Sequence, residues 1–133
     1  MKPGGVLYWL LLIIAVATLI SGVVQLVNPS FVLRIVAAEQ TATTRHFFGI
    51  VGMFMALFGG MLTHALLKAA DPSIVLLWAG LQKLGASAAV GLGVLNHIFS
   101  STALLIASFD LLSGILIFVY LGNVTRWKTS IGR

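Results

Sequence analysis

Two charged side chains lie inside long apolar stretches of this sequence. Lys83 lies near the middle of an apolar run over residues 72–95, and Asp110 lies near the middle of a run over residues 101–121. A charge at the centre of a bilayer costs at least about 2.5–3.5 kcal/mol, so each of the two needs a compensating partner. Because only a short turn separates the two runs, we expect Lys83 and Asp110 to form a buried pair, with Gln82 beside it.

Two roles are open to such a pair. It can be structural, because a self-compensating ion pair fixes the register of two helices. It can instead be a coupling site, where a proton or a substrate binds during transport. We expect the structural role, because the apolar runs contain no acidic residue other than Asp110 that would extend a proton relay.

Three histidines raise the question of metal or haem chemistry. His46 stands at the start of the run over residues 44–69, and His97 follows the run over residues 72–95, so both are expected at the same membrane boundary. Two such histidines could ligate a b-type haem or contribute to a metal site. No HxxxH or HxxE spacing supports ligation, so we expect neither cofactor. His64 has no second histidine at its depth, which favours a role in the core.

Small residues recur at helical spacing in the second apolar run. Gly52, Ala56, Gly60 and His64 follow one another at every fourth position. Such a stripe lets two helix backbones approach closely, which is how membrane helices pack where no hydrophobic force drives them together. We therefore expect this stripe to face another helix, either within the chain or in a second protein.

The composition is that of a polytopic membrane protein. Of the 133 residues, 59% are hydrophobic and only 8% are charged, against about 25% charged in soluble domains. Cysteine is absent, which argues against thiol-redox chemistry, and the motifs of serine hydrolases, zinc proteases and nucleotide-binding enzymes are also absent. We therefore expect a protein that is not an enzyme. The net charge of +5 does not indicate nucleic-acid binding, because the basic residues stand at the ends of apolar runs.

The apolar runs predict an all-α fold in a single domain over residues 1–133. Each run is long enough to cross a bilayer as a helix, which satisfies every backbone polar group within the segment. The expected spans cover residues 5–27, 44–69, 72–95 and 101–121. Short connections between them predict an up-down-up-down four-helix transmembrane bundle.

A shorter element is expected between the first two spans. Asn28 and Pro29 form a helix stop and start signal. The segment over residues 30–39 that follows is too short to span, and it has apolar residues on one side, which predicts a helix lying in the membrane interface. The first span itself is too long for a signal peptide, so we expect it to be retained.

Basic residues predict the orientation. Those expected on one side of the membrane are Lys2, Lys68, Arg126, Lys128 and Arg133. Only Arg34 and Arg45 are expected on the other side. The excess predicts that both termini lie in the cytoplasm and that the protein resides in the cell membrane. The residues expected to form an aromatic belt at the cytoplasmic end are Tyr8, Trp9, Trp78, Tyr120 and Trp127.

The layout of the whole chain resembles the DoxX-like group of small four-helix membrane proteins. The shared features are a first span followed by Asn28 and Pro29, a glycine-rich second span opened by Arg45 (RHFFGIVGMFMALFGG), and two further spans joined by tight turns. Some members of that group look like accessory subunits of larger membrane or redox complexes, so the resemblance implies a helper role. The cysteines of the redox-active relatives are missing here.

Three functions are therefore open. We expect first a non-enzymatic accessory, assembly or scaffold subunit, whose partners are the lipid bilayer and other membrane proteins or a second copy of itself. The alternative is a small oligomeric transporter or channel that uses Lys83 and Asp110. A second alternative is a membrane haem or metal protein that uses His46 and His97.

Overall fold

A computed structural model describes residues 5–131 of the chain, and this part is entirely helical apart from its connections. Its five helices are α1 (Val6–Val27), α2 (Pro29–Ile35), α3 (Ala42–Lys68), α4 (Ser73–Leu95) and α5 (Ala103–Ile131). By length and composition, α1, α3, α4 and α5 are each able to cross a membrane. The expectation of an all-α protein with four apolar helices long enough to span a bilayer is confirmed. Lys2 and Arg133, used above to predict orientation, lie outside the described residues.

Local capping explains where α2 and α3 begin. The Asn28 side chain accepts a hydrogen bond from Phe31 N at 3.2 Å, and Pro29 occupies the first turn of α2. The Thr41 side chain accepts a hydrogen bond from Thr44 N at 3.0 Å and so caps α3. Both caps satisfy backbone donors that the first turn of a helix leaves free.

The helix after the first span is shorter than the expected segment over residues 30–39. It ends at Ile35, because Ala37 adopts the left-handed conformation with φ 51° and Ala38 N bonds back to Leu33 O at 2.9 Å. His97 has φ 59° and ends α4 in the same way, with Ile98 N bonded to Gly93 O at 2.8 Å. These are helix-closing turns that a hydropathy pattern does not reveal.

The last helix is longer than expected. Hydropathy placed the end of the span at residue 121, whereas α5 continues to Ile131. The apolar stretch stops but no proline or capping glycine stops the helix, and hydroxyl side chains such as Thr125 bond back to the preceding turn, to Leu121 O at 3.0 Å. The polar end of α5 therefore extends past the part that is apolar enough to lie in lipid.

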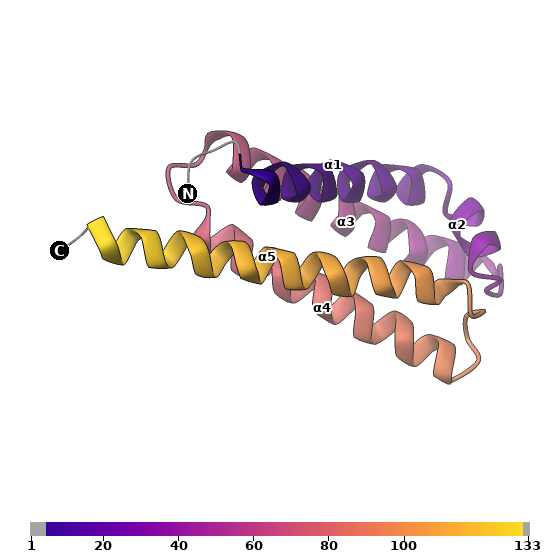
Figure 1. The fold of residues 1–133 in the computed structure, drawn as a ribbon. Helices are drawn as coiled ribbons and strands as arrows, with labels where there is room; N and C mark the ends of the chain where they lie inside the picture. Colours follow the sequence, from indigo (N-terminus) through magenta and orange to yellow (C-terminus); the bar gives the residue numbers. More distant parts are fainter. Residues whose placement is uncertain (1–4, 132–133) are drawn as a thin grey trace.

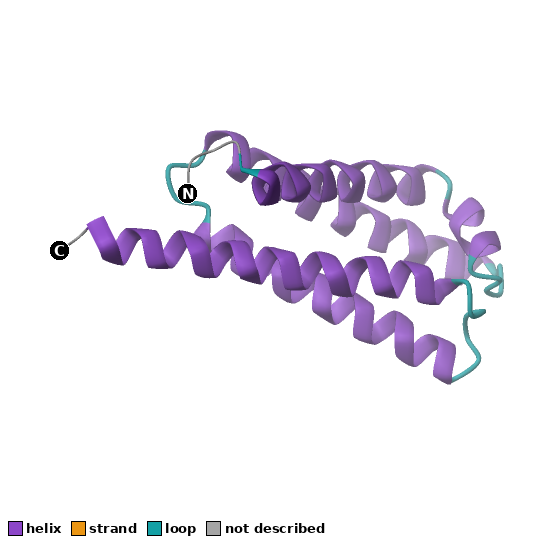
Figure 2. Ribbon diagram, viewed as in Figure 1, coloured by secondary structure: helices purple, strands orange, loops and turns teal. Residues whose placement is uncertain are grey.

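The long helices are arranged as two pairs. As Figure 1 shows, α1 lies along α3 and α4 lies along α5, and contacts between these pairs are far fewer than contacts within them. The start of α1, the connection over residues 69–72 and the end of α5 lie at one end (Figure 2). Helix α2 and the connection over residues 96–102 lie at the other end. The short connection between α3 and α4 does not make them a closely packed pair, since these two helices touch only slightly.

Backbone contact joins α1 to α3 at three glycines. A Cβ atom added to Gly22 would lie 2.3 Å from Ala56 N, one added to Gly52 would lie 2.5 Å from Leu26 N, and one added to Gly59 would lie 2.4 Å from Leu19 N. No real side chain fits at such distances without a shift of the opposite backbone. The small residues therefore set how closely the two helices approach.

Only the first half of the expected stripe of small residues packs closely against another helix of the described chain. Gly52 and Ala56 lie against α1, but a Cβ on Gly60 would meet only Leu19 Cδ1 at 3.8 Å, and His64 is exposed. An α-helix has 3.6 residues per turn, so a strict spacing of four drifts by about 40° at each step. The contact face continues through Gly59 instead.

A core cluster closes the end of the molecule near the start of α1. It draws on all four long helices and consists of Tyr8, Leu11, Ala15, Leu62, Leu66, Leu76, Ala79, Ile117 and Tyr120. Tyr8 and Tyr120 are buried here, and the Tyr8 hydroxyl donates to Leu66 O at 3.2 Å. Their assignment to an aromatic belt is therefore wrong, whereas Trp9, Trp78 and Trp127 are exposed. Toward α2 the pairs are joined again, by the hydrogen bond from Ser100 N to Val36 O at 2.8 Å, and space remains between them before that end.

Candidate functional site

The structure brings Lys83 and Asp110 together between α4 and α5. Lys83 Nζ lies 2.6 Å from Asp110 Oδ1, and the two residues are only 3% and 6% exposed. The pair therefore lies in the protein interior. Each charge compensates the other, as burial in an apolar region requires.

The surroundings of the pair hold the lysine in place but leave hydrogen-bonding capacity unused. The Phe109 ring lies 5.0 Å from Lys83 Nζ, which is a cation–π distance. An ammonium group has three donors, and a carboxylate has two acceptor oxygens. Only one donor and only Oδ1 are used within residues 5–131, which leaves two N–H groups of Lys83 and Asp110 Oδ2 without protein partners in this range.

A cavity of about 500 Å³ adjoins the pair on the side of α1 and α2. Most of its wall is apolar, and its lining comprises Thr18, Ile20, Ser21, Val24, Gln25, Phe31, Val32, Ile35, Met55, Lys83, Leu105, Ile106, Phe109 and Asp110. A volume of this size falls within the range of small-molecule pockets. The cavity lies between the two helix pairs, where the fold keeps them apart.

A smaller hollow of about 140 Å³ lies beside the cavity, toward α3 and α4. The residues that the two spaces share are Gln25, Val32, Met55, Lys83, Ile106 and Asp110. Gln82 lines only the smaller hollow of these two. Lys83, Asp110 and Gln82, which the sequence places at similar depth, all line the smaller hollow.

Two further polar side chains face this space from α1. Gln25 is 6% exposed and donates through Nε2 to Phe48 O at 2.9 Å, which ties α1 to α3. Thr18 is 3% exposed, and its Oγ1 has no hydrogen-bond partner among the described residues. A buried hydroxyl normally bonds to the preceding turn of its own helix, so an unpartnered one at a cavity wall is unusual.

Sequence reasoning did not assign Thr18, Ser21 or Gln25 to a site. Their spacing of three and four residues was the available signal, because it places all three on one face of an otherwise apolar helix. Only the tertiary structure shows that this face looks toward Asp110.

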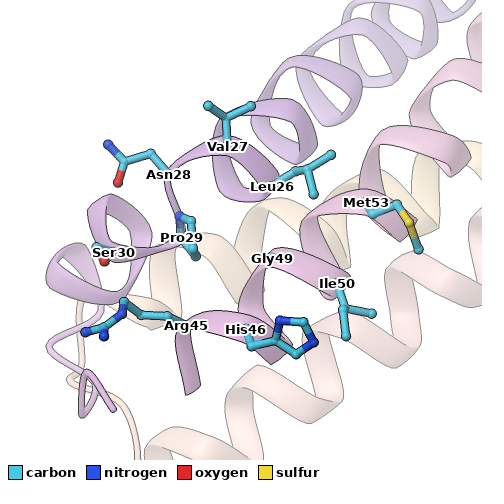
Figure 3. A pocket seen from close by; sticks show the side chains of 10 residues that line it. All are labelled: Leu26, Val27, Asn28, Pro29, Ser30, Arg45, His46, Gly49, Ile50 and Met53. Carbon is cyan, nitrogen blue, oxygen red and sulfur yellow. The ribbon is translucent and has the colours of Figure 1, made fainter. Parts of the chain in front are cut away.

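Of the two arginines expected at the membrane interface, Arg34 and Arg45, only Arg45 lines a separate groove at the end of the molecule that contains α2. It has a volume of about 570 Å³ between the end of α1, α2 and the start of α3 (Figure 3). Arg45 and His46 line it, and their side chains leave α3 in opposite directions. Arg45 Nη1 donates to Gln40 O at 2.9 Å. Arg34 is exposed in the last turn of α2 and is not part of this lining.

The structure does not assemble a ligand set from the histidines. No hydrogen bond or ring contact joins His46 to His97, and His97 does not line the groove that contains His46. Within residues 5–131 no three histidine or acidic side chains come close enough to hold a metal ion. The expected core role of His64 is wrong, because this side chain is exposed on α3.

The site thus consists of a neutral ion pair in the wall of an apolar cavity. Neither Glu39 nor Asp71 lines the cavity or the smaller hollow, so no second carboxylate of the described chain stands beside Asp110. Such an arrangement can bind the polar group of a ligand through free donors and acceptors. Comparisons with protein-family models, with curated proteins and with solved structures find no match to this chain.

Proposed function

We propose that the chain is a non-enzymatic, multi-pass protein of the cell membrane that serves as an accessory or scaffold subunit. In this proposal α1, α3, α4 and α5 cross the bilayer alternately, and α2 lies in the interface. Two observations support this arrangement. Four of the helices are long and apolar enough to span a membrane, and no non-helical connection between successive helices is longer than seven residues. The layout shared with DoxX-like proteins is consistent with a helper role.

The orientation with both termini in the cytoplasm rests on charge. Lys68, Arg126 and Lys128 belong to the end that contains the start of α1, whereas Arg34 and Arg45 belong to the end that contains α2. Basic residues are retained on the cytoplasmic side during insertion. Reporter fusions after residue 131 and within residues 36–41 should report opposite sides, and a cytoplasmic signal from residues 36–41 would reverse the orientation.

The proposal that another membrane protein or a second copy binds this chain rests on an uncovered face of α4. Gly85 and Gly91 have no atom of another segment within 4 Å of an added Cβ, and Ala88 and Ala89 between them are exposed. Small residues on α1 and α3 lie in close contact between those two helices, whereas the small residues on this face of α4 have no helix of the described chain against them. Small residues in a membrane helix permit close approach of a second helix, so a helix of another protein or of a second copy fits this face.

The matched experiment uses two glycines that are both open. Gly85→Leu adds a bulky side chain on the uncovered face of α4, and Gly122→Leu adds the same side chain at an open position on α5. Capture of membrane proteins by the tagged chain, expressed at its native level, should fall several-fold for Gly85→Leu and stay unchanged for Gly122→Leu. If the parent chain is monomeric in native membranes and captures nothing, the accessory function is wrong.

A small transporter is the second candidate function, and the cavity beside Lys83 and Asp110 favours it. Ionisable residues inside membrane proteins mark substrate and ion pathways in many transporters. The test is flux into proteoliposomes that contain the purified chain. Proton or substrate flux that disappears in the double variant Lys83→Met with Asp110→Leu, while the protein remains folded, would place transport ahead of the accessory role.

A further inference from the structure

The cavity beside the ion pair has an apolar rim that is exposed on the molecular surface. Ile20 and Val24 of α1 are 58% and 39% exposed, and Phe31 of α2 is 45% exposed. Across the cavity, Leu105 and Phe109 of α5 are 76% and 43% exposed. If α1 and α5 cross a bilayer, as proposed above, this rim faces acyl chains. A ligand therefore reaches the cavity sideways from the lipid, and its body must be apolar.

The polar wall at the inner side of the cavity defines the head of that ligand. Asp110 Oδ2 offers an acceptor and Lys83 Nζ offers donors, and none of these is used by the part of the chain that the structure describes. Thr18 Oγ1 adds a buried hydroxyl without a partner in the same range. One group on the ligand that both donates and accepts would match this wall, and a hydroxyl does both.

Charge and hydrogen-bonding capacity exclude the other common lipid head groups. Lys83 and Asp110 together are neutral, so a carboxylate or an amine in the cavity would add an unbalanced charge in apolar surroundings. A ketone or ester is neutral but only accepts, which would leave Asp110 Oδ2 without a donor. A hydrocarbon would leave the whole polar wall unsatisfied.

We propose that this cavity binds a long-chain alcohol or another uncharged, hydroxyl-headed lipid. Its hydroxyl group donates to Asp110 Oδ2 and accepts from Lys83 Nζ and from Thr18 Oγ1. Its chain lies against Val24, Phe31 and the other apolar residues of the rim. The proposal rests on membrane insertion but not on a protein partner, so it goes beyond the accessory function.

The test uses the purified full-length chain in lipid nanodiscs and hexadecanol carrying a photoreactive group on its chain. Labelling should be saturable and should map to residues 18–25, 31–35 and 105–110. Unlabelled hexadecanol should compete, whereas hexadecane and hexadecanoate at the same concentration should not. Equal competition by hexadecane, or better competition by hexadecanoate, would overturn the proposal.

Two adjacent positions on α1 provide a matched pair of variants that leaves the ion pair intact. Val24 lines the cavity and Val23, which is 45% exposed, lines none of the hollows described here. Val24→Trp should fill the cavity and reduce labelling at least about tenfold, which corresponds to about 1.4 kcal/mol, whereas Val23→Trp should label like the parent. Unchanged labelling of Val24→Trp, or equal loss in both variants, would contradict the proposed site.

Removal of a single hydroxyl tests the head group. Thr18→Val keeps the shape of the side chain, and we expect it to weaken labelling about two- to tenfold, the effect of one hydrogen bond. Labelling that is unaffected in both Thr18→Val and Lys83→Met would show that the polar wall does not recognise the ligand. Partner capture fails or succeeds independently of these measurements, because they use the isolated chain.

Discussion

Two ion pairs involve α5, and they differ in their access to water. Asp110, in the first third of α5, pairs with Lys83 of α4 inside the protein, where both side chains are less than 10% exposed. Lys128, near the end of α5, pairs with Asp71 in the connection between α3 and α4, where the side chains are 41% and 54% exposed. The charges and the contact are of the same kind. What differs is whether water can solvate the remaining charge when one partner is removed.

Water is the alternative partner for the exposed pair. Hydrogen bonds from Lys128 and then from Ser73, whose Oγ lies 2.6 Å from Asp71 Oδ1, hold the pKa of Asp71 well below its ordinary value. Either residue can nevertheless be solvated if the other is lost, and salt screens the attraction. The buried pair has no such alternative, because removal of one member leaves a charge in apolar surroundings. Loss of one partner is therefore expected to destabilise the protein much more at the buried pair than at the exposed pair.

The largest effect is expected from breaking the buried pair. Lys83→Met or Asp110→Leu alone should lower the free energy of unfolding by about 3–5 kcal/mol, because each strands the other charge. Combining the two substitutions should recover much of this loss. Reversible unfolding in mixed micelles measures both. Single variants as stable as the parent would mean that the pair is already hydrated through the cavity.

Two adjacent glycines of α3 show a similar contrast, because one is tightly packed against α1 and the other is not. Gly59→Ala places a methyl group 2.4 Å from Leu19 N and should cost about 1–3 kcal/mol, because backbones must separate. Gly60→Ala meets only Leu19 Cδ1 at 3.8 Å and should be neutral or slightly stabilising, since alanine favours the helix. The free energy of unfolding and the efficiency of cross-linking between α1 and α3, measured for both variants, distinguish the two positions. Similar losses in both variants would show that the contact face is assigned wrongly.

A smaller effect of opposite sign is expected at the cavity wall. Thr18→Val removes a buried hydroxyl that has no partner in residues 5–131, so it should raise the free energy of unfolding by about 1 kcal/mol. The same variant should bind hexadecanol less well. A gain in stability together with a loss of binding would identify Thr18 as a residue retained for a ligand; a loss of stability would show that its hydroxyl is satisfied in the folded protein.

The smallest effect is expected from the exposed pair. Asp71→Asn or Lys128→Gln should leave unfolding at neutral pH nearly unchanged. Because the pKa of Asp71 is lowered in the folded chain, its contribution is present above the ordinary aspartate pKa of about 3.9 and is lost as pH falls through the lower folded value. A comparison of parent and Asp71→Asn between pH 6 and the lowest pH at which the fold survives checks this sign. A large loss at neutral pH would contradict the contrast between the two pairs.

Patterns that depend on one helix at a time were readable in the sequence. Hydropathy located the four long apolar helices, since each must be apolar enough for lipid irrespective of its neighbours. Local capping chemistry located the start of α2, at Asn28 with Pro29. The depths of Lys83 and Asp110 within their runs brought them to the same level, because a short turn leaves adjacent helices little freedom to slide.

Features that depend on which helices meet were decided only by the tertiary structure. The close contact of α1 with α3, and of α4 with α5, follows from how glycines and large side chains interlock, so a short hairpin did not make α3 and α4 close neighbours. The choice of Gly59 over Gly60 depends on the rotation of α3 about its axis. The cavity exists because side chains of the two helix pairs do not fill the space between the core cluster and the end that contains α2. Each of these depends on packing between surfaces distant in the chain, which spacing within one helix does not encode.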